Sequence, residues 1–288
     1  MRRKKMKHKF FYIIIILIIG LNIYTLFFLR ARYNNEKHNK ELMQDIEQYI
    51  NPNDIYDDKY QFMNIEFSKL KQQNEDTVSY LVVDGSEISY PVVQTKDNKY
   101  YLNHSFDKKE NNAGWVFMDY RNNANSLDKN TIIYGHNRLT GTMFGTLKEL
   151  LEDSYYQKDT HYIYLYTENK NYVFEVFSVY TIQKETYYLK KDFTSDKEYE
   201  KFLTILQNRS KYSFPTIVTN QDKIITLSTC SGNNDRTVVH AKLIYEKEKR
   251  TEQQFFLYYY NLKYRLIDCY IFYIIQFYDE FSLYQVFS

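Results

Sequence analysis

The sequence predicts a mainly β protein that closes into a β-barrel with helical insertions. Two observations support this prediction. Between residues 76 and 247, short runs of β-branched, aromatic and aliphatic residues alternate with polar turn segments, as is typical of strands. Only a few stretches of this region space their apolar residues as a helix does. Many short strands with few helices favour a closed barrel, in which every strand edge is paired.

The predicted strands of this region cover residues 78–83, 88–93, 115–118, 131–134, 162–167, 172–182, 224–229 and 237–245. Asp84 and Gly85 separate the first two strands, and this dipeptide favours a tight hairpin turn. The polar segment 168–171 indicates a second, longer hairpin. Apolar residues at helical spacing predict short helices over residues 142–151 and 196–208.

A basic segment, residues 1–9, precedes an uncharged and strongly apolar segment, residues 10–29. At about 1.5 Å per residue, a helix over the second segment would be about 30 Å long, which matches the hydrocarbon core of a bilayer. A cleaved signal peptide is the alternative. The apolar run is longer than a typical signal-peptide core, and no small-residue cleavage site follows it. We therefore expect an uncleaved transmembrane anchor.

The charges beside the anchor predict its orientation. Positively charged flanks stay on the cytoplasmic side, so residues 1–9 indicate a cytoplasmic N-terminus. The protein would be a single-pass protein of the cell membrane, with everything after about residue 30 outside the cell. A basic run can also bind nucleic acid. Its position beside the apolar segment favours the membrane instead, and the formal net charge of the chain is only +2, so we expect no nucleic-acid partner.

Residues 30–75 are polar and predict a helical stalk that leads into the barrel. Leu42, Ile46 and Ile50 repeat at helical spacing, and apolar residues between positions 62 and 70 indicate a second helical piece. For the first half of this region, a solvated spacer is an equally good interpretation.

The last segment, residues 248–288, is an extension crowded with Phe and Tyr. Its longest uncharged run, residues 269–278, is too short to cross a bilayer. We expect that the barrel does not need this segment. Two interpretations stay open, a functional element and an out-of-frame or poorly selected extension.

Cys230 stands at the end of the predicted strand 224–229, and Arg236 begins the next strand after a short polar turn. A thiolate is a strong nucleophile, and a nearby guanidinium favours the thiolate over the thiol. This arrangement therefore suits covalent catalysis. The alternative is a small buried side chain, because free cysteines are often found in protein cores.

A second string, Tyr134-Gly135-His136-Asn137, follows another short apolar strand. Together the two strings resemble the sortases, the membrane-anchored cysteine transpeptidases of Gram-positive bacteria. The resemblance covers about residues 76–245 and rests on the strings T-L-S-T-C at 226–230, Y-G-H-N at 134–137 and R-x-V-V-H at 236–240. The strings Y-P-V-V-Q at 90–94 and G-W-V-F-M-D-Y-R-N at 114–122 resemble the class B branch.

The resemblance implies an eight-stranded barrel and a role for each of three residues. Cys230 would attack the peptide carbonyl of a sorting signal and form a thioacyl-enzyme. His136 would protonate the leaving amine and then deprotonate the incoming one. Arg236 would stabilise the oxyanion or hold the substrate backbone. The alternatives are a turn histidine for His136 and a surface ion pair with Asp235 for Arg236.

The same resemblance implies the substrate groove and the partners. Ser228 and Thr229 would help to line the groove. Weaker candidates, which could equally be structural, are Tyr134, Asn98, Leu102 and Tyr188. The substrate would be an LPxTG-like signal, cleaved after its Thr, and the acceptor a peptidoglycan cross-bridge amine or a pilin lysine.

The two cysteines, Cys230 and Cys269, are too few for a disulfide framework and have no C-x-x-C metal spacing. No nucleotide loop, haem motif or acidic cluster indicates a cofactor, so we expect none. Two other functions stay open. One is a cysteine protease that hydrolyses the same signal, and the other is a catalytically silent, membrane-anchored binding barrel.

Overall fold

The computed structural model describes residues 2–56, 59–183, 185–230 and 235–249, and for residues 2–10, 52–56 and 230 it describes the backbone alone. Residues 250–288, which include Cys269 and most of the expected C-terminal extension, lie outside the described residues.

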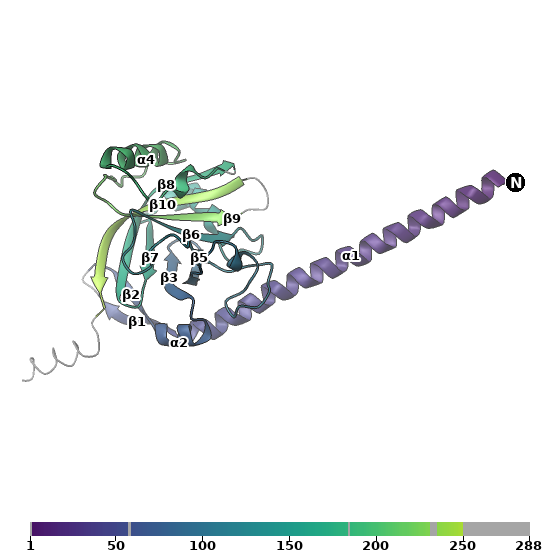
Figure 1. Ribbon diagram of the computed structural model, residues 1–288, viewed down its shortest axis with the longest axis horizontal. Coiled ribbons are helices and arrows are strands. Elements are labelled where there is room, and N and C mark those ends of the chain that lie inside the picture. The colour runs from purple at the N-terminus through teal and green to yellow at the C-terminus, as the bar shows by residue number, and fades with distance from the viewer. Residues whose placement is uncertain (1, 57–58, 184, 231–234, 250–288) are drawn as a thin grey trace, which may run out of the picture. The chain divides into compact units, whose positions relative to one another are not determined.

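Eight strands form a closed barrel, which confirms the predicted fold class (Figure 1). They are β3 (Thr77–Val83), β4 (Ser89–Val93), β5 (Phe117–Met118), β6 (Asn130–His136), β7 (Tyr162–Tyr166), β8 (Lys170–Gln183), β9 (Ile224–Cys230) and β10 (Asp235–Glu248). Around the barrel their order is β10-β8-β7-β3-β4-β5-β6-β9. The two predicted hairpins are present, because β3 pairs with β4 and β7 with β8, both antiparallel. The sheet is mixed, since β4–β5 and β6–β9 are parallel.

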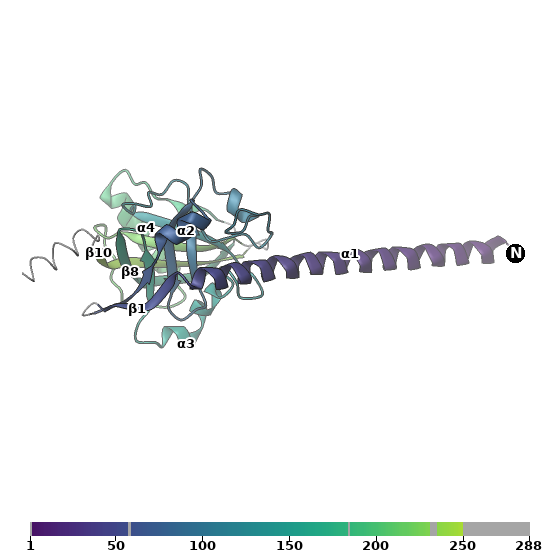
Figure 2. The ribbon, with the colours of Figure 1, turned by 90° about the horizontal axis from the view of Figure 1, so that it is seen from below.

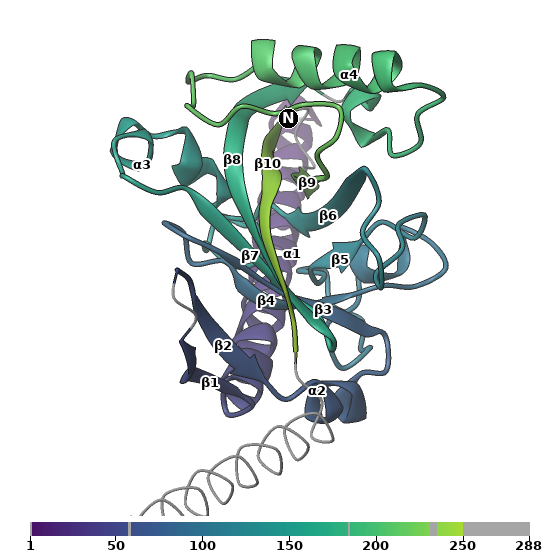
Figure 3. The ribbon, with the colours of Figure 1, turned by 90° about the vertical axis from the view of Figure 1, so that its left-hand side faces the viewer.

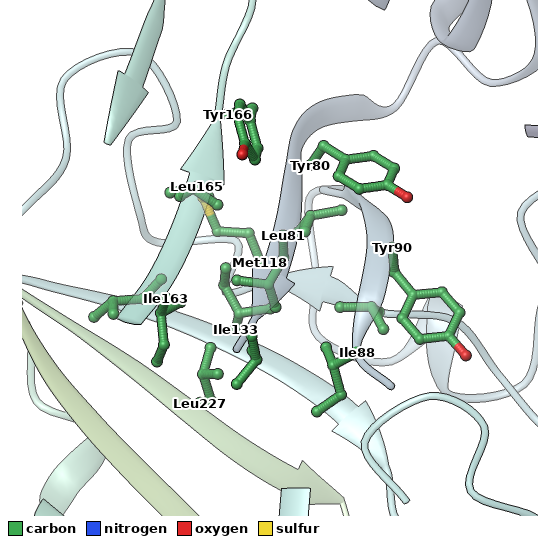
Figure 4. Close-up of a cluster of buried hydrophobic side chains, with 14 of the residues drawn as sticks. Tyr80, Leu81, Ile88, Tyr90, Met118, Ile133, Ile163, Leu165, Tyr166 and Leu227 are labelled. Atoms are coloured by element: carbon green, nitrogen blue, oxygen red, sulfur yellow. The ribbon is translucent and has the colours of Figure 1, made fainter. Parts of the chain in front are cut away.

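Aliphatic side chains from strands that lie far apart in the sequence fill the barrel. Figure 4 shows Leu81, Met118, Ile133, Ile163 and Leu227 meeting in the interior, and each is completely buried. Burying one such side chain contributes about 1.5–3 kcal/mol. Ile133 on β6 and Leu227 on β9 are paired positions, so they also define which face of these two strands points into the barrel.

Apart from the long N-terminal helix, the helical elements are short and cover the outside of the barrel. They are α2 (Phe67–Gln73), η1 (Tyr100–Leu102), η2 (Leu147–Leu151), α3 (Asp153–Tyr156), η3 (Tyr187–Leu189) and α4 (Asp196–Asn208). The predicted helix over 196–208 has the same bounds as α4, which lies over the ends of β8 and β10 (Figures 1 and 3). Its buried residues, Tyr199, Phe202, Leu203 and Leu206, pack in one cluster with Phe177, Ile224 and Val238. Of the predicted helix over 142–151, only the end is helical, as η2.

A single helix, α1 (Arg2–Glu47), contains both the predicted anchor and the first part of the predicted stalk. By length and composition, Phe11–Glu47 is the one helix in the described part of the chain that could cross a membrane, with a mean hydropathy of 2.5 over its most apolar window. None of that window is buried inside the structure.

After α1 the chain forms a two-stranded antiparallel sheet, β1 (Ile50–Tyr56) and β2 (Gln61–Ile65), where we expected a helix. The expected second helical piece is therefore wrong over residues 62–65 and correct only for α2. The reason is tertiary packing, which overrides local propensity. The ring of Phe62 packs edge-on against Tyr164 and Tyr166 of the barrel and stacks on Tyr245. The elements β1, α2 and the end of α1 lie on one side of the barrel (Figure 2).

Candidate active site

His136 and Cys230 occupy paired positions on neighbouring strands. β6 and β9 run parallel, and their register pairs Tyr134 with Ser228 and His136 with Cys230. Adjacent strands lie about 4.8 Å apart, so the backbones of the candidate nucleophile and the candidate acid–base residue are direct neighbours. The sequence spacing alone does not bring these two residues together, and the parallel pairing of β6 and β9 does.

The alternation of side chains along the strands separates the candidate site from the core. Ile133 and Leu227 point into the barrel (Figure 4), so the following positions, Tyr134 and Ser228, belong to the outer face. His136 and Cys230, two residues further on, are positions of that same outer face. The site therefore lies where two strand ends meet, outside the packed interior.

The imidazole of His136 is fixed by a backbone carbonyl. Its Nε2 atom lies 2.7 Å from the carbonyl oxygen of Leu102. A carbonyl oxygen only accepts hydrogen bonds, so Nε2 carries the hydrogen and Nδ1 is left for proton exchange. Leu102, which we expected to line the groove, contacts His136 through its backbone carbonyl.

Gly114 explains how the backbone approaches the imidazole so closely. Its φ is +63°, a conformation that L side chains rarely adopt. A Cβ atom at this position would lie 2.6 Å from Cδ2 of His136 and 2.7 Å from the carbonyl oxygen of Tyr101. Glycine is therefore needed both for the backbone conformation and for the contact with the ring. Gly114 begins the string at 114–122, but that string alone does not predict its contact with His136.

Arg236 is connected to β9 through Tyr188. The Nη1 atom of Arg236 donates to the phenolic oxygen of Tyr188 over 3.2 Å, and that oxygen lies 3.0 Å from Oγ of Ser228. Tyr188 and Ser228 are completely buried. This chain of hydrogen bonds holds the guanidinium beside the strand that ends at Cys230.

Thr229 has a different partner because it lies on the other face of β9. Its Oγ1 atom accepts a hydrogen bond from the backbone N–H of Thr237 over 2.9 Å, and its side chain is almost fully buried. The side chain of Thr229 therefore connects the end of β9 to the start of β10 by a hydrogen bond. Three of the groove candidates are thus packed against other parts of the protein. Ser228, Thr229 and Tyr188 expose at most 1% of their surface.

Comparison with known proteins identifies the family. Residues 81–244 match the family profile described as the Sortase domain. The chain belongs to the sortase family. It is 32% identical to Sortase B of Listeria monocytogenes over 234 residues, which covers 80% of this chain and 94% of that relative. It is 34% identical to Sortase B of Staphylococcus aureus over 243 residues, covering 81% and 93%.

Solved sortase B structures agree with this sortase in fold. Sortase B from Bacillus anthracis in complex with AAEK1 has a TM-score of 0.64 at 38% identity and covers 74% of this chain and 99% of its own. The Staphylococcus aureus sortase B–substrate complex has a TM-score of 0.59 at 34% identity, covering 75% and 96%. These similarities confirm the predicted class B resemblance. Sortases are cysteine transpeptidases, so family membership supports that activity for this chain.

Tyr134 and Asn98, two weaker groove candidates of this sortase, share a buried carboxylate. The hydroxyl of Tyr134 donates to Oδ2 of Asp119 over 2.8 Å, and Nδ2 of Asn98 donates to the same oxygen over 3.0 Å. Arg121 donates to both carboxylate oxygens at 2.8 and 2.7 Å. Burial alone would raise the pKa of Asp119, but the hydrogen bonds and charge of Arg121 outweigh it, and the pKa is lowered. Asp119 thus stays ionised and fixes the outer face of β6.

No metal site is found among the residues whose side chains the structure describes, since no three His, Cys, Asp or Glu side chains there are grouped closely enough to hold an ion.

Proposed function

We propose that this sortase is a class B transpeptidase that cleaves an LPxTG-like sorting signal after its Thr. It would join the new Thr carboxyl group to an amine, either of a peptidoglycan cross-bridge or of a pilin lysine. The observation that carries the proposal is the paired position of His136 and Cys230 on β6 and β9, with Arg236 connected to Ser228 of the same strand. Binding of a signal peptide is further supported by the substrate complex of the Staphylococcus aureus relative.

In the first half-reaction, Nδ1 of His136 carries the proton that the Cys230 thiol has given up, and the thiolate attacks the carbonyl carbon of the scissile bond. A C–S bond forms, and the carbonyl oxygen takes up negative charge in the tetrahedral intermediate. Arg236 donates to that oxygen or holds the neighbouring peptide backbone. When the intermediate collapses, the C–N bond breaks and the leaving amine takes a proton from Nδ1 of His136. The products are a thioester on Cys230 and the released C-terminal peptide.

In the second half-reaction, the acceptor amine attacks the thioester carbonyl. Nδ1 of His136 takes the proton that this amine loses, so the histidine returns to its starting state. The C–S bond breaks, a new amide bond forms, and the thiolate leaves. Nε2 is held by its hydrogen bond to Leu102, which supports a role for Nδ1 in both steps.

We further propose that α1 anchors this enzyme in the cell membrane as a single span with the N-terminus in the cytoplasm. The apolar part of α1 supports the anchor. The basic segment 1–9 supports the orientation. The catalytic barrel would then face the cell wall, where both proposed substrates are found.

The test is a peptide-cleavage assay with and without an added amine. We expect the full-length protein in detergent to cleave an LPxTG-like peptide and to form the amide product when a glycine oligomer is present. Cleavage that yields only the free acid at every amine concentration would show that the protein is a cysteine protease and not a transpeptidase. The lack of any cleavage across a panel of sorting signals would favour a silent binding barrel.

A further inference from the structure

The end of α1 contacts the barrel through buried polar side chains. Glu36 and Asn39 are 5% and 1% exposed. Burying a carboxylate is unfavourable unless it is paired and hydrogen-bonded. Glu36 meets this condition, because Arg138 forms an ion pair with Oε1, and Thr140 and Thr142 donate to Oε2 over 3.0 and 2.6 Å.

All three partners of Glu36 belong to the segment 137–143, which directly follows His136. This segment leaves β6 at His136 and returns beside it, since the N–H of Phe144 donates to the carbonyl oxygen of His136 over 3.0 Å. Arg138 also donates to the carbonyl oxygen of Asn112 over 3.3 Å. Glu36 therefore holds the segment that directly follows His136 at the end of β6.

Asn39 contacts the backbone segment that lies against the imidazole of His136. Its Nδ2 atom donates to the carbonyl oxygen of Gly114 over 3.1 Å. Its Oδ1 atom accepts from Nδ2 of Asn111 over 2.8 Å, and that nitrogen also donates to the carbonyl oxygen of Asn35 over 3.0 Å. Gly114 is the residue whose backbone lies against the ring of His136. One turn of α1 thus holds the segment that follows His136 and the backbone that lies against its ring.

We propose that Glu36 and Asn39 are positioning residues that make the end of the membrane-anchor helix part of the active site, by fixing the two backbone segments that orient His136. This inference rests on the proposed function of His136. α1 is continuous from Arg2 to Glu47, so the same helix that carries the apolar segment orients the acid–base residue.

The chemistry of the contact supports a precise fit. Burial would raise the pKa of Glu36, but hydrogen bonds from Thr142 and Arg138 and the charge of Arg138 lower it, so the carboxylate stays ionised. Removing one partner of a buried ion pair leaves the other charge without compensation. A displacement of a reacting group by about 1 Å costs on the order of a hundredfold in rate. A small shift of the segment 137–143 is therefore enough to be seen in turnover.

The test compares Glu36→Gln with His38→Ala in the full-length protein. His38 is the matched control because it also connects α1 to the barrel, through Asp107 at 3.1 Å, without contacting His136 or the segment after it. We expect Glu36→Gln to lower kcat by about ten- to a hundredfold with little change in the KM for the peptide. We expect His38→Ala to leave both nearly unchanged. Thermal unfolding of both variants shows whether a loss of stability accounts for the difference.

Exchanging the charges of Glu36 and Arg138 tests whether the lost kcat can be rescued. Glu36→Arg combined with Arg138→Glu should recover part of the kcat that either single change loses, and the histidine NMR signal of His136 should return towards its wild-type position. Equal kcat for Glu36→Gln and His38→Ala, while His136→Ala still abolishes transfer, would overturn the positioning role alone. Normal transfer by His136→Ala would instead contradict the proposed function.

Discussion

Tyr188 links two candidate residues through one phenolic hydroxyl. Arg236 donates to this oxygen, and Ser228 lies within hydrogen-bond distance of it. The guanidinium is thereby held near β9. Ordering this long side chain costs conformational entropy, which the hydrogen bond to the buried tyrosine offsets. Tyr188, one of the groove candidates, is completely buried and accepts a hydrogen bond from Arg236.

We expect Tyr188→Phe to lower the rate of transfer because it removes this link and keeps the ring. A hydrogen bond to a charged group contributes about 1.5–3 kcal/mol, so the loss in kcat/KM should be on the order of ten- to a hundredfold. Tyr187→Phe is the control, since the hydroxyl of Tyr187 contacts Tyr180 and does not contact Arg236. Steady-state kinetics with a sorting-signal peptide measure both. Equal kinetics for the two variants would remove Tyr188 from the site.

At the scale of elements, a buried polar network holds β9, β10 and η3 together. His240 on β10 is paired with Thr226 on β9, and its Nδ1 atom lies 2.8 Å from Oγ1 of Thr226. Thr226 donates to Asn130 over 2.6 Å, and Asn130 donates to the carbonyl oxygen of Tyr188 over 3.1 Å. This network connects the strand that ends at Cys230 with the turn that carries Tyr188.

The stability of the protein should depend on pH through His240. Complete burial lowers the pKa of His240 to about 3, whereas an unfolded histidine has a pKa of about 6.5. Between these values the unfolded state binds a proton that the folded state does not, so the free energy of unfolding falls as the pH falls below about 6.5. The slope from this residue is about 1.4 kcal/mol per pH unit.

Denaturant unfolding at pH values between about 5 and 6.5 measures this slope above the range in which most carboxyl groups titrate. His240→Gln keeps hydrogen-bonding groups without a titrating ring, so its slope should be smaller by about one proton. Identical slopes for the wild type and His240→Gln would show that the buried histidine does not control acid stability. Histidine NMR of the folded wild type gives its pKa directly if the variant does not fold.

Much of the element pattern could be predicted because it depends on local sequence. The hairpins β3–β4 and β7–β8 and the helix α4 follow from alternation, turn residues and helical spacing. The hairpin β1–β2 could not be predicted, because Phe62 is buried by aromatic rings of β7 and β10 that are remote in sequence.

The candidate site shows the same division. Strings around His136, Cys230 and Arg236 were visible in the sequence. The contacts of Glu36 with Arg138 and of Leu102 with His136 were not, because they join segments whose proximity depends on the closed barrel.

At the scale of the whole molecule, the proposed anchor predicts a topology. We expect protease added to intact, wall-stripped cells to digest the barrel, because residues after about 30 would lie outside the membrane. A cytoplasmic protein in the same cells is the control for intactness. Full protection of the barrel would contradict the orientation, and so would a soluble mature form that lacks residues 1–30.

The central claim is that Cys230 alone carries the acyl group. Trapping the thioacyl-enzyme with a sorting-signal peptide and locating the adduct by mass spectrometry tests this claim most directly. Cys269, in the C-terminal extension, is the internal control. We predict an adduct on Cys230, no transfer by Cys230→Ala, and unchanged transfer by Cys269→Ala. An adduct on Cys269, or undiminished turnover by Cys230→Ala, would contradict the account.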